Sequence, residues 1–273
     1  MNDPNVTKCD TRPIEARYPD LEGKVVVVTG AARGMGATFA QELARTGMNV
    51  IGADINAEDM DTTAKRINEE LAGVQGAGRV VGQRMDVTVP EDHDALVRLA
   101  VDEFGRLDRW VNNAGLFPQA GLMDVTGQQI DSTYRVNVNG VFYGAQAAAR
   151  HFSENGGGAI VNMASVASVR VRVTRSVYNS SKAAVKHLTN CMSVELGPLG
   201  VRVNAIAPGF IDTEMTRWVH EEPGALDRVL TTVPLRRIGA PVEVYGALAF
   251  LLSDASRYVN GCTIAVDGGS QHV

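Results

Sequence analysis

The regular alternation of short β-branched runs with longer helical stretches constrains the fold more than any other feature of this sequence. The runs, which we predict to be strands, cover residues 24–29, 50–54, 80–86, 107–111, 159–163, 201–207 and 263–266. The helical stretches cover residues 34–46, 57–71, 90–104, 128–152, 177–196 and 241–252. Strands separated by helices imply parallel β-α-β crossovers, and the run at 25–28 is apolar on both faces, as expected for a strand covered by helices on both sides. We therefore predict an α/β fold: one doubly wound domain with a seven-stranded parallel sheet and helices on both faces.

The length and composition fit a single large domain. A chain of 273 residues with 45% hydrophobic residues can bury a full core, and single cores stop growing at roughly 250 residues. Residues 1–20 are polar, contain Pro4, Pro13 and Pro19, and show no apolar period. We expect an N-terminal arm or a disordered tail there, and the folded domain at 21–273.

Charge and hydropathy exclude several classes of function. The formal charge of −5 comes from 31 acidic and 26 basic residues scattered along the chain, which gives no reason to expect nucleic acid or an anionic membrane as a partner. No apolar run approaches the ~20 residues of a membrane helix, and the N-terminus lacks the apolar stretch of a secretory signal. Cys9, Cys191 and Cys262 are odd in number and far apart, so we predict reduced thiols and no metal site. We expect a soluble cytoplasmic protein.

A glycine-rich turn follows the first predicted strand. Gly30 permits a tight turn, Gly34 lets the backbone approach a pyrophosphate, and Gly36 allows the helix to pack closely on the strand. Glycine spacing alone also fits a generic strand-to-helix turn. The position directly after the first strand favours a dinucleotide, and hence a Rossmann-type domain.

Acidic residues end the next two predicted strands. The carboxylate of Asp54, 24 residues after Gly30, can accept hydrogen bonds from both ribose hydroxyls and would repel a 2′-phosphate, which favours NAD over NADP. Arg33 could supply some compensating positive charge, and Asp54 could also simply end a strand. Asp86 and Val87 would flank the adenine.

Further motifs follow the later strands in order. Asn112-Asn113-Ala114-Gly115 follows the fourth strand, Ser165 the fifth, and Tyr178 and Lys182 open the next helix. Together with the glycine turn, these motifs make the chain similar to the short-chain dehydrogenase/reductase family over about residues 23–270. That family consists of enzymes that interconvert alcohols and ketones with a nicotinamide cofactor.

The resemblance assigns four catalytic residues. Tyr178 corresponds to the general acid/base, Lys182 to the lysine that binds the nicotinamide ribose and lowers the pKa of the tyrosine, and Ser165 to the serine that binds the substrate oxygen. Asn137 corresponds to the asparagine that anchors a water relay to the lysine. Tyr178 and Lys182 are four residues apart, about one helical turn, so a helix places them on one face. The alternative, that Tyr178 and Lys182 are a pair on the protein surface, is disfavoured when Ser165 and the glycine turn are also considered.

The resemblance also implies the cofactor site. Ile211, through its backbone, and Thr213, through its hydroxyl, would hold the nicotinamide carboxamide. The full set of residues expected at the cofactor is Gly30, Arg33, Gly34, Met35, Gly36, Asp54, Ile55, Asp86, Val87, Asn113, Ala114, Gly115, Tyr178, Lys182, Pro208, Gly209, Ile211 and Thr213.

The sequence departs from the family pattern between Ser165 and Tyr178. The glycines common in this loop are absent, and β-branched residues stiffen it. Arg170, Arg172 and Arg175 could bind a substrate carboxylate, but arginines alternating with valines more often mark a half-exposed strand or an oligomer contact, which is the interpretation we favour.

The segment at about 210–237 is similar to the family's substrate lid. Phe117, Phe210, Met215 and Trp218 could form an apolar pocket around Ser165, although ordinary lid packing would also explain them. We expect a modest, largely apolar ketone or secondary alcohol as substrate.

The leading hypothesis is an NAD-dependent alcohol dehydrogenase or carbonyl reductase. The alternatives are an enzyme like 3-oxoacyl-carrier-protein reductase and a non-catalytic NAD-binding regulatory or scaffold protein. The family commonly forms homotetramers through segments that correspond here to 128–152, 177–196 and 260–273, so the resemblance implies a homotetramer.

Overall fold

The computed structural model describes residues 9–12, 14, 16 and 18–273 and contains one seven-stranded sheet. The strands are all parallel and lie in the order β3-β2-β1-β4-β5-β6-β7. Their bounds are β1 Val25–Thr29, β2 Asn49–Asp54, β3 Val80–Arg84, β4 Arg109–Asn112, β5 Gly158–Met163, β6 Val201–Pro208 and β7 Thr263–Val266. The predicted doubly wound α/β fold with seven parallel strands is confirmed.

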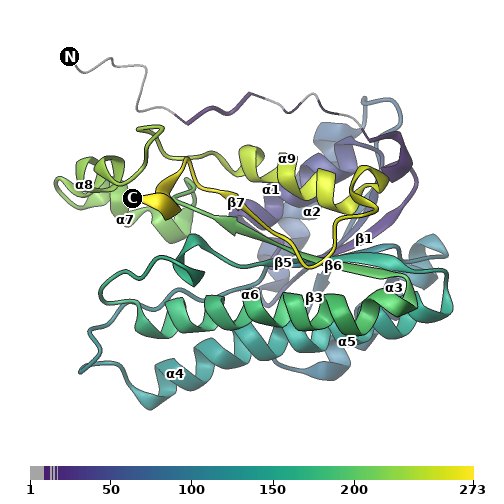
Figure 1. Cartoon of the computed structure of the whole chain (residues 1–273). Helices are drawn as coiled ribbons and strands as arrows, with labels where there is room; N and C mark the ends of the chain where they lie inside the picture. The colour runs from purple at the N-terminus through teal and green to yellow at the C-terminus, as the bar shows by residue number, and fades with distance from the viewer. Residues whose placement is uncertain (1–8, 13, 15, 17) are drawn as a thin grey trace.

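Helices cover both faces of the sheet (Figure 1). The helix bounds are α1 Gly34–Arg45, α2 Ala57–Leu71, α3 Pro90–Phe104, α4 Gly127–Tyr134, α5 Gly140–Glu154, α6 Ser176–Leu196, α7 Trp218–Glu221, α8 Ala225–Thr231 and α9 Pro241–Leu252. Helices α1, α2 and α9 share one core cluster, and α3, α5 and α6 share the other. The valines of β1 divide between them, since Val26 and Val28 belong to the first cluster and Val25 and Val27 to the second. This division explains why the run is apolar at every position.

The predicted helix at 128–152 corresponds to continuous helical backbone over 127–154, but this stretch is not α-helical throughout. It consists of α4 and α5 joined by a π-helical segment, Arg135–Asn139. A π turn bonds residue i to residue i+5 and adds about one residue without ending the helix, so helical patterns continue on both sides of it. Periodicity therefore could not reveal it.

The third strand ends two residues earlier than predicted. The backbone N–H of Asp86 donates to the Asp92 carboxylate at 2.7 Å instead of continuing the sheet. Asp86 thus lies in the loop that precedes α3.

The lid follows β6 and has its own small core. It contains a 3-10 turn at Glu214–Thr216, then α7 and α8, and it lies at one end of the molecule, on the left in Figure 1. Phe210, Val219, Val229, Leu230, Val233 and Ile238 form its apolar cluster.

The predicted N-terminal arm falls largely outside the described residues, because 1–8, 13, 15 and 17 are not among them. Of the residues that are described, Ile14 packs against the core cluster of α1, α2 and α9, and Cys9 packs against the lid cluster. No helix in the described part of the chain combines the length and hydropathy needed to cross a bilayer.

Candidate active site

A groove runs along the carboxyl ends of β1 to β4. It is lined by Gly30, Arg33, Gly34, Met35, Gly36, Asp54, Ile55, Met85, Asp86, Val87, Asn113, Ala114, Gly115, Leu116, Val136, Thr213, Glu214 and Met215. In doubly wound sheets ligands bind at this edge, where the loops leave the strands. The groove contains the predicted cofactor residues from Gly30 to Gly115.

The glycine turn at the start of the groove is closely packed. Gly30 has a φ of +65°, and a Cβ there would lie 2.8 Å from the Ala114 Cα. A Cβ on Gly36 would lie 1.9 Å from the Gly30 carbonyl oxygen, so α1 can approach the turn only because this residue is glycine. The amide of Asn113 donates to the carbonyl oxygens of Thr29 and Gly30, both at 2.9 Å. The motif after β4 therefore braces the turn after β1.

The carboxylate of Asp54 has a fixed orientation at the far end of the groove. Its oxygens accept hydrogen bonds from the backbone N–H groups of Ala32 at 3.1 Å and Asn56 at 3.2 Å. The side chain of Ile55 beside it is 64% exposed, which leaves an apolar surface open in the groove.

Arg33 does not offer a free positive charge there. Its guanidinium pairs with Asp59 at 3.1 Å and with Glu214 at 3.0 Å, and both carboxylates are exposed. Glu214, which the sequence did not single out, adds negative charge to this end of the groove.

The groove continues into a second pocket under the lid. This pocket is lined by Met35, Asn113, Gly115, Phe117, Met163, Ala164, Ser165, Val166, Ala167, Arg172, Arg175, Tyr178, Lys182, Pro208, Gly209, Phe210, Ile211, Thr213, Met215, Thr216 and Trp218. Met35, Asn113, Gly115, Thr213 and Met215 line both spaces, so the two are continuous.

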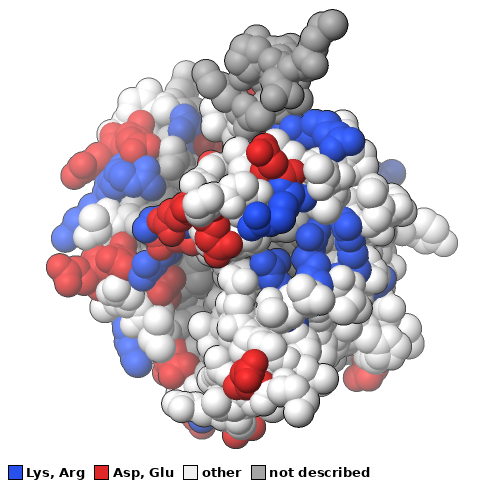
Figure 2. All heavy atoms as spheres, turned by 90° about the vertical axis from the view of Figure 1, so that its left-hand side faces the viewer, with Lys and Arg blue, Asp and Glu red and all other residues white. Residues whose placement is uncertain are grey.

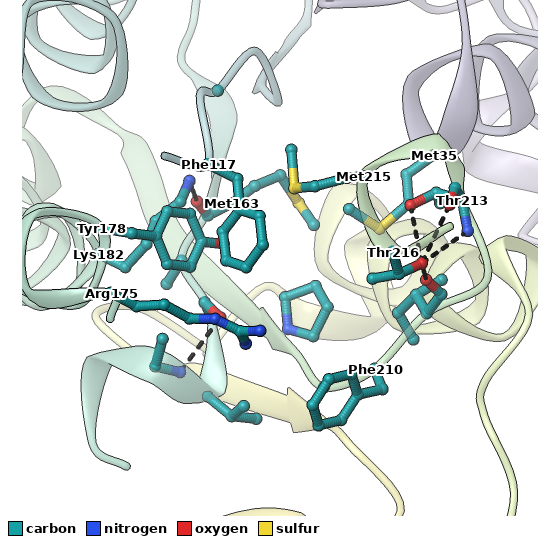
Figure 3. A pocket seen from close by; sticks show the side chains of 18 of the residues that line it. Met35, Phe117, Met163, Arg175, Tyr178, Lys182, Phe210, Thr213, Met215 and Thr216 are labelled. Atoms are coloured by element: carbon teal, nitrogen blue, oxygen red, sulfur yellow. Dashed lines mark hydrogen bonds between the residues drawn. The ribbon is translucent and has the colours of Figure 1, made fainter. Parts of the chain in front are cut away.

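The close-up in Figure 3 shows how the pocket is built around Tyr178. The Phe117 ring meets the Tyr178 ring edge-on at 4.7 Å between centroids. Arg175 points into the same space, between Tyr178 and Phe210. The four apolar residues expected in the substrate pocket, Phe117, Phe210, Met215 and Trp218, all line it.

Burial controls the titration of Tyr178 and Lys182. It raises the pKa of the Tyr178 phenol, and the Ser165 hydroxyl and the Arg175 charge act in the opposite direction. Burial also lowers the pKa of Lys182 to about 8. The ammonium of Lys182 donates to the Met163 carbonyl oxygen at 2.7 Å and lies 5.8 Å from the Tyr178 ring centroid. In this protein without cofactor, the phenol pKa is therefore raised, whereas the family resemblance implies a lowered one.

Asn137 lies in the π-helical segment and is fully buried. Its amide donates to the Leu116 carbonyl and to the Ser181 hydroxyl, both at 3.0 Å, and its Oδ1 accepts from the Leu116 N–H at 2.7 Å. Both amide hydrogens are used, which leaves one acceptor position on Oδ1. A Cβ on Gly115 would lie 3.4 Å from Asn137 Oδ1 and 3.5 Å from Lys182 Nζ, so the two atoms flank this glycine.

The favoured interpretation of the 166–177 stretch is wrong about the strand. Residues 166–168 form a 3-10 turn, and irregular turns follow up to α6. Arg172 and Arg175 line the pocket, whereas Val171 and Val173 are 83% and 87% exposed. Arginines and valines do alternate in direction along this stretch, but a period of two in the sequence does not indicate which set faces inward.

Groove and pocket together have the chemistry that a dinucleotide needs. The glycine cradle excludes Cβ atoms where a pyrophosphate would approach, and the oriented Asp54 carboxylate can accept two hydroxyl hydrogen bonds. Among the described residues, no three His, Cys, Asp or Glu side chains are grouped as metal ligands.

Comparison with known proteins gives consistent matches over nearly the whole chain. A family model described as enoyl-(acyl carrier protein) reductase matches residues 30–271. A 2-(R)-hydroxypropyl-CoM dehydrogenase of Xanthobacter autotrophicus is 37% identical over 248 residues, which are 90% of this chain and 97% of that protein. A 3-oxoacyl-(acyl-carrier-protein) reductase of Thermotoga maritima is 37% identical over 249 residues, which are 91% of this chain and 98% of that protein. A solved short-chain type dehydrogenase/reductase of Mycobacterium marinum is 35% identical with a TM-score of 0.84, covering 93% of this chain and 97% of its own.

Proposed function

The chain belongs to the short-chain dehydrogenase/reductase family and is an oxidoreductase acting on CH–OH donors, and on this premise we propose that it interconverts a secondary alcohol and a ketone with NAD as cofactor. The observation that carries the proposal is the convergence of Ser165, Tyr178 and Lys182 in one pocket that continues into the groove ending at Asp54. Bound NAD supplies the hydride acceptor in oxidation and, when reduced, the hydride donor.

The residues of the pocket supply proton transfer and orientation. Tyr178 donates its phenolic proton to the carbonyl oxygen in reduction and accepts the hydroxyl proton in oxidation. The Ser165 hydroxyl binds the same substrate oxygen. Because burial raises the pKa of Tyr178, the phenol is protonated at neutral pH, which suits its role as the acid in reduction.

Two further residues position this machinery. Lys182, fixed by the Met163 carbonyl, binds the nicotinamide ribose. Asn137, with the free acceptor position on its Oδ1, holds a water that carries protons toward Lys182.

NAD is preferred over NADP in this proposal because of the charge at the adenosine end of the groove. Asp54, Asp59 and Glu214 are all acidic, and Arg33 is already paired with two of them. A 2′-phosphate would meet net negative charge.

The direct test is Tyr178→Phe, with turnover and NADH binding measured separately. The variant should bind NADH as the wild type does and lose at least ~100-fold in kcat, the low end of what general acid/base catalysis contributes. Tyr258→Phe, at a fully exposed tyrosine, is the control and should keep both properties. Activity of Tyr178→Phe near that of the wild type would reject the proposed role.

A 3-oxoacyl-carrier-protein reductase is the second candidate, favoured by the similar protein of Thermotoga maritima. Lys and Arg side chains gather on one half of the face at which the lid lies, and acidic side chains mix with them on the other half (Figure 2). A panel of ketones, alcohols and carrier-linked thioesters with both cofactors separates the two. A strong preference for carrier-linked thioesters with NADPH would favour this second function.

We propose a homotetramer in the cytoplasm. Strand β7 is an edge strand whose four residues are all half-buried, and Phe142 on α5 and Val194 on α6 are 42% and 75% exposed. Burial of these surfaces in partner subunits would protect the edge strand. Light scattering should give about four times the 29.1 kDa chain mass.

A further inference from the structure

The two arginines in the pocket have an unusual arrangement for a surface loop. Along residues 169–173, the valines face the solvent and Arg172 faces the pocket, with Val169 49% exposed and Val173 87% exposed. The hydrophobic effect alone favours the opposite arrangement, because buried apolar and solvated charged side chains are both of lower free energy. The inversion therefore costs stability, and a ligand that pairs with the charges would offset that cost.

The loop holds this arrangement through contacts on both sides. Arg170 donates to the carbonyl oxygens of Thr232 at 3.2 Å and Ser270 at 2.6 Å, and Asn179 on α6 donates to the Arg172 carbonyl at 3.1 Å. The Thr174 carbonyl accepts from the Ala120 N–H at 2.8 Å. These bonds fix the backbone, so the inward direction of the arginines belongs to the fold.

Neither pocket arginine is neutralised by a carboxylate of the described residues. Arg172 lies over the Phe210 ring at 4.4 Å, and Arg175 lies over the rings of Phe117 and Trp218 at 4.7 and 4.9 Å. Their hydrogen bonds to Thr232 and Gln119 are long, at 3.5 and 3.4 Å. The nearby Glu222 pairs with Arg228 at 3.9 Å.

Two hydrogen-bond donors of residues that line the pocket have no partner among the described residues. Arg175 Nε and the indole Nε1 of Trp218 are both buried without a hydrogen-bond partner in the described structure. Both residues line the pocket. A buried donor without an acceptor is unfavourable, so a small shift of either side chain toward an acceptor on a ligand would lower the free energy of the complex.

The charges that line the pocket also favour an anionic ligand. Its lining contains three cations, Arg172, Arg175 and Lys182, and no Asp or Glu. The sequence from 155 to 194 likewise contains no acidic residue. Burial, with the charges of Arg170 and Arg175, lowers the pKa of Arg172 to about 10, and an anion beside it would favour the charged form.

We propose that Arg172 and Arg175 bind an anionic group, a carboxylate in the first instance, on the ketone or alcohol that this enzyme turns over. The proposal rests on the function proposed above and names its substrate class: short oxo acids and the corresponding hydroxy acids. In reduction, the hydride adds to the carbonyl carbon, Tyr178 delivers the proton to the oxygen, and the carboxylate is unchanged. This replaces the expectation of a largely apolar substrate.

The geometry limits the length of that substrate. The Tyr178 ring centroid and the Arg175 guanidinium carbon each lie 4.7 Å from the Phe117 ring centroid. They are therefore separated by at most twice that distance, about 9 Å, so the anion must lie within a few bonds of the carbonyl. The aromatic rings of Phe117, Phe210 and Trp218 form the walls between them.

The experiment compares acids with their methyl esters, which keep the shape and remove the charge. Acetoacetate and levulinate are each assayed with NADH beside the ester, in wild type, Arg172→Met, Arg175→Met and Arg98→Met. Methionine retains the apolar stem of arginine without the charge. Arg98 is exposed on α3 outside both lining sets and provides the matched loss of one charge.

The expected wild-type ratio of kcat/KM for acid over ester is roughly 10 to 100, the range for a charged hydrogen-bonded pair. Arg172→Met and Arg175→Met should each bring the ratio close to one, Arg175→Lys should restore part of it, and Arg98→Met should keep it. Equal turnover of acids and esters by the wild type, or an unchanged ratio in both methionine variants, overturns the proposal.

A binding measurement separates this proposal from the proposed function. Calorimetric titration of the enzyme–NAD⁺ complex with levulinate and its ester measures binding without turnover, because an oxo group cannot accept a hydride from the oxidised cofactor. Tighter binding of the acid that Arg175→Met removes supports the anion site even where the Tyr178→Phe assay refutes the chemistry. Equal binding of acid and ester overturns the anion site and leaves the oxidoreductase function standing.

Discussion

Replacement of Gly36 by alanine tests how closely α1 must pack against the turn after β1. The new Cβ would lie 1.9 Å from the Gly30 carbonyl oxygen and 2.7 Å from Asn113 Nδ2. Carbon and oxygen atoms in contact are normally ~3.3 Å apart or more, so the helix and the turn must separate by about 1.4 Å. Both obstacles belong to the backbone turn or to the asparagine that braces it.

The expected cost follows from this displacement. Overpacking of this kind costs about 1–3 kcal/mol, against which alanine gains up to ~1 kcal/mol in helix propensity. Because the new Cβ overlaps with backbone, we expect the upper part of the overpacking range, about 2–3 kcal/mol, and hence a net loss of about 1–2 kcal/mol in the free energy of unfolding. For a chain of this size this lowers the Tm by roughly 2–8 °C. The N–H groups of the first turn of α1 move with the helix, so NADH affinity should fall by about 10-fold or more.

Calorimetric melting of the free protein gives the first quantity and NADH titration the second. Gly127→Ala is the control: Gly127 begins α4, and a Cβ there meets no atom within 4 Å. This control should change stability by less than ~1 kcal/mol and leave NADH affinity unchanged. If Gly36→Ala melts and binds NADH like the control, the close approach of α1 to the turn does not support the cofactor site.

Two further predictions concern charge. Asp54→Ala should lower the ratio of kcat/KM for NAD over NADP by roughly 10- to 100-fold, because it removes a charged acceptor for the ribose hydroxyls and a repulsion of the 2′-phosphate. The control Asp61→Ala on α2 should leave the ratio unchanged. An unchanged ratio in Asp54→Ala would contradict the assignment. Burial lowers the pKa of Lys182 from 10.5 to about 8, so between these values the unfolded chain binds a proton that the folded protein lacks, and stability rises with pH. Denaturant unfolding without cofactor at pH 8 and at pH 9.5 measures this effect. Between the two pH values, the free energy of unfolding of the wild type should rise by up to about 2 kcal/mol relative to that of Lys182→Met. A fall over that interval would contradict the direction of the pKa shift.

Most of the fold could be predicted from the sequence, because apolar periodicity, helix-starting prolines, capping residues and glycines at turns define its elements locally. The bounds of α2, α3, α9 and β7 agree with the prediction, since Pro90 and Pro241 begin two of these helices and Asn56 caps the third. The π-helical turn within the helix at 128–152 could not be predicted, because the helix continues on both sides of it.

For the candidate site, too, the sequence predicted the position of most residues but not of all. Every predicted cofactor and substrate residue lines the groove or the pocket, because most of them lie at or after the carboxyl end of a strand and parallel strands end at one edge of the sheet. Asn137 lines neither space and lies behind Gly115, where its amide contacts Leu116 and Ser181.

What the sequence by itself determined is the order of the strands along the chain, the position of each motif at a strand end, and the residue types available for hydride and proton transfer. Only the tertiary structure decided the environment of those residues. Burial raises the pKa of Tyr178 and lowers that of Lys182, and the path of the glycine-free loop turns Arg172 and Arg175 inward and its valines outward. The physical reason is that solvation and the inward face of an irregular loop depend on contacts with segments far away in sequence, here Thr232, Ser270 and Ala120, which no local pattern contains.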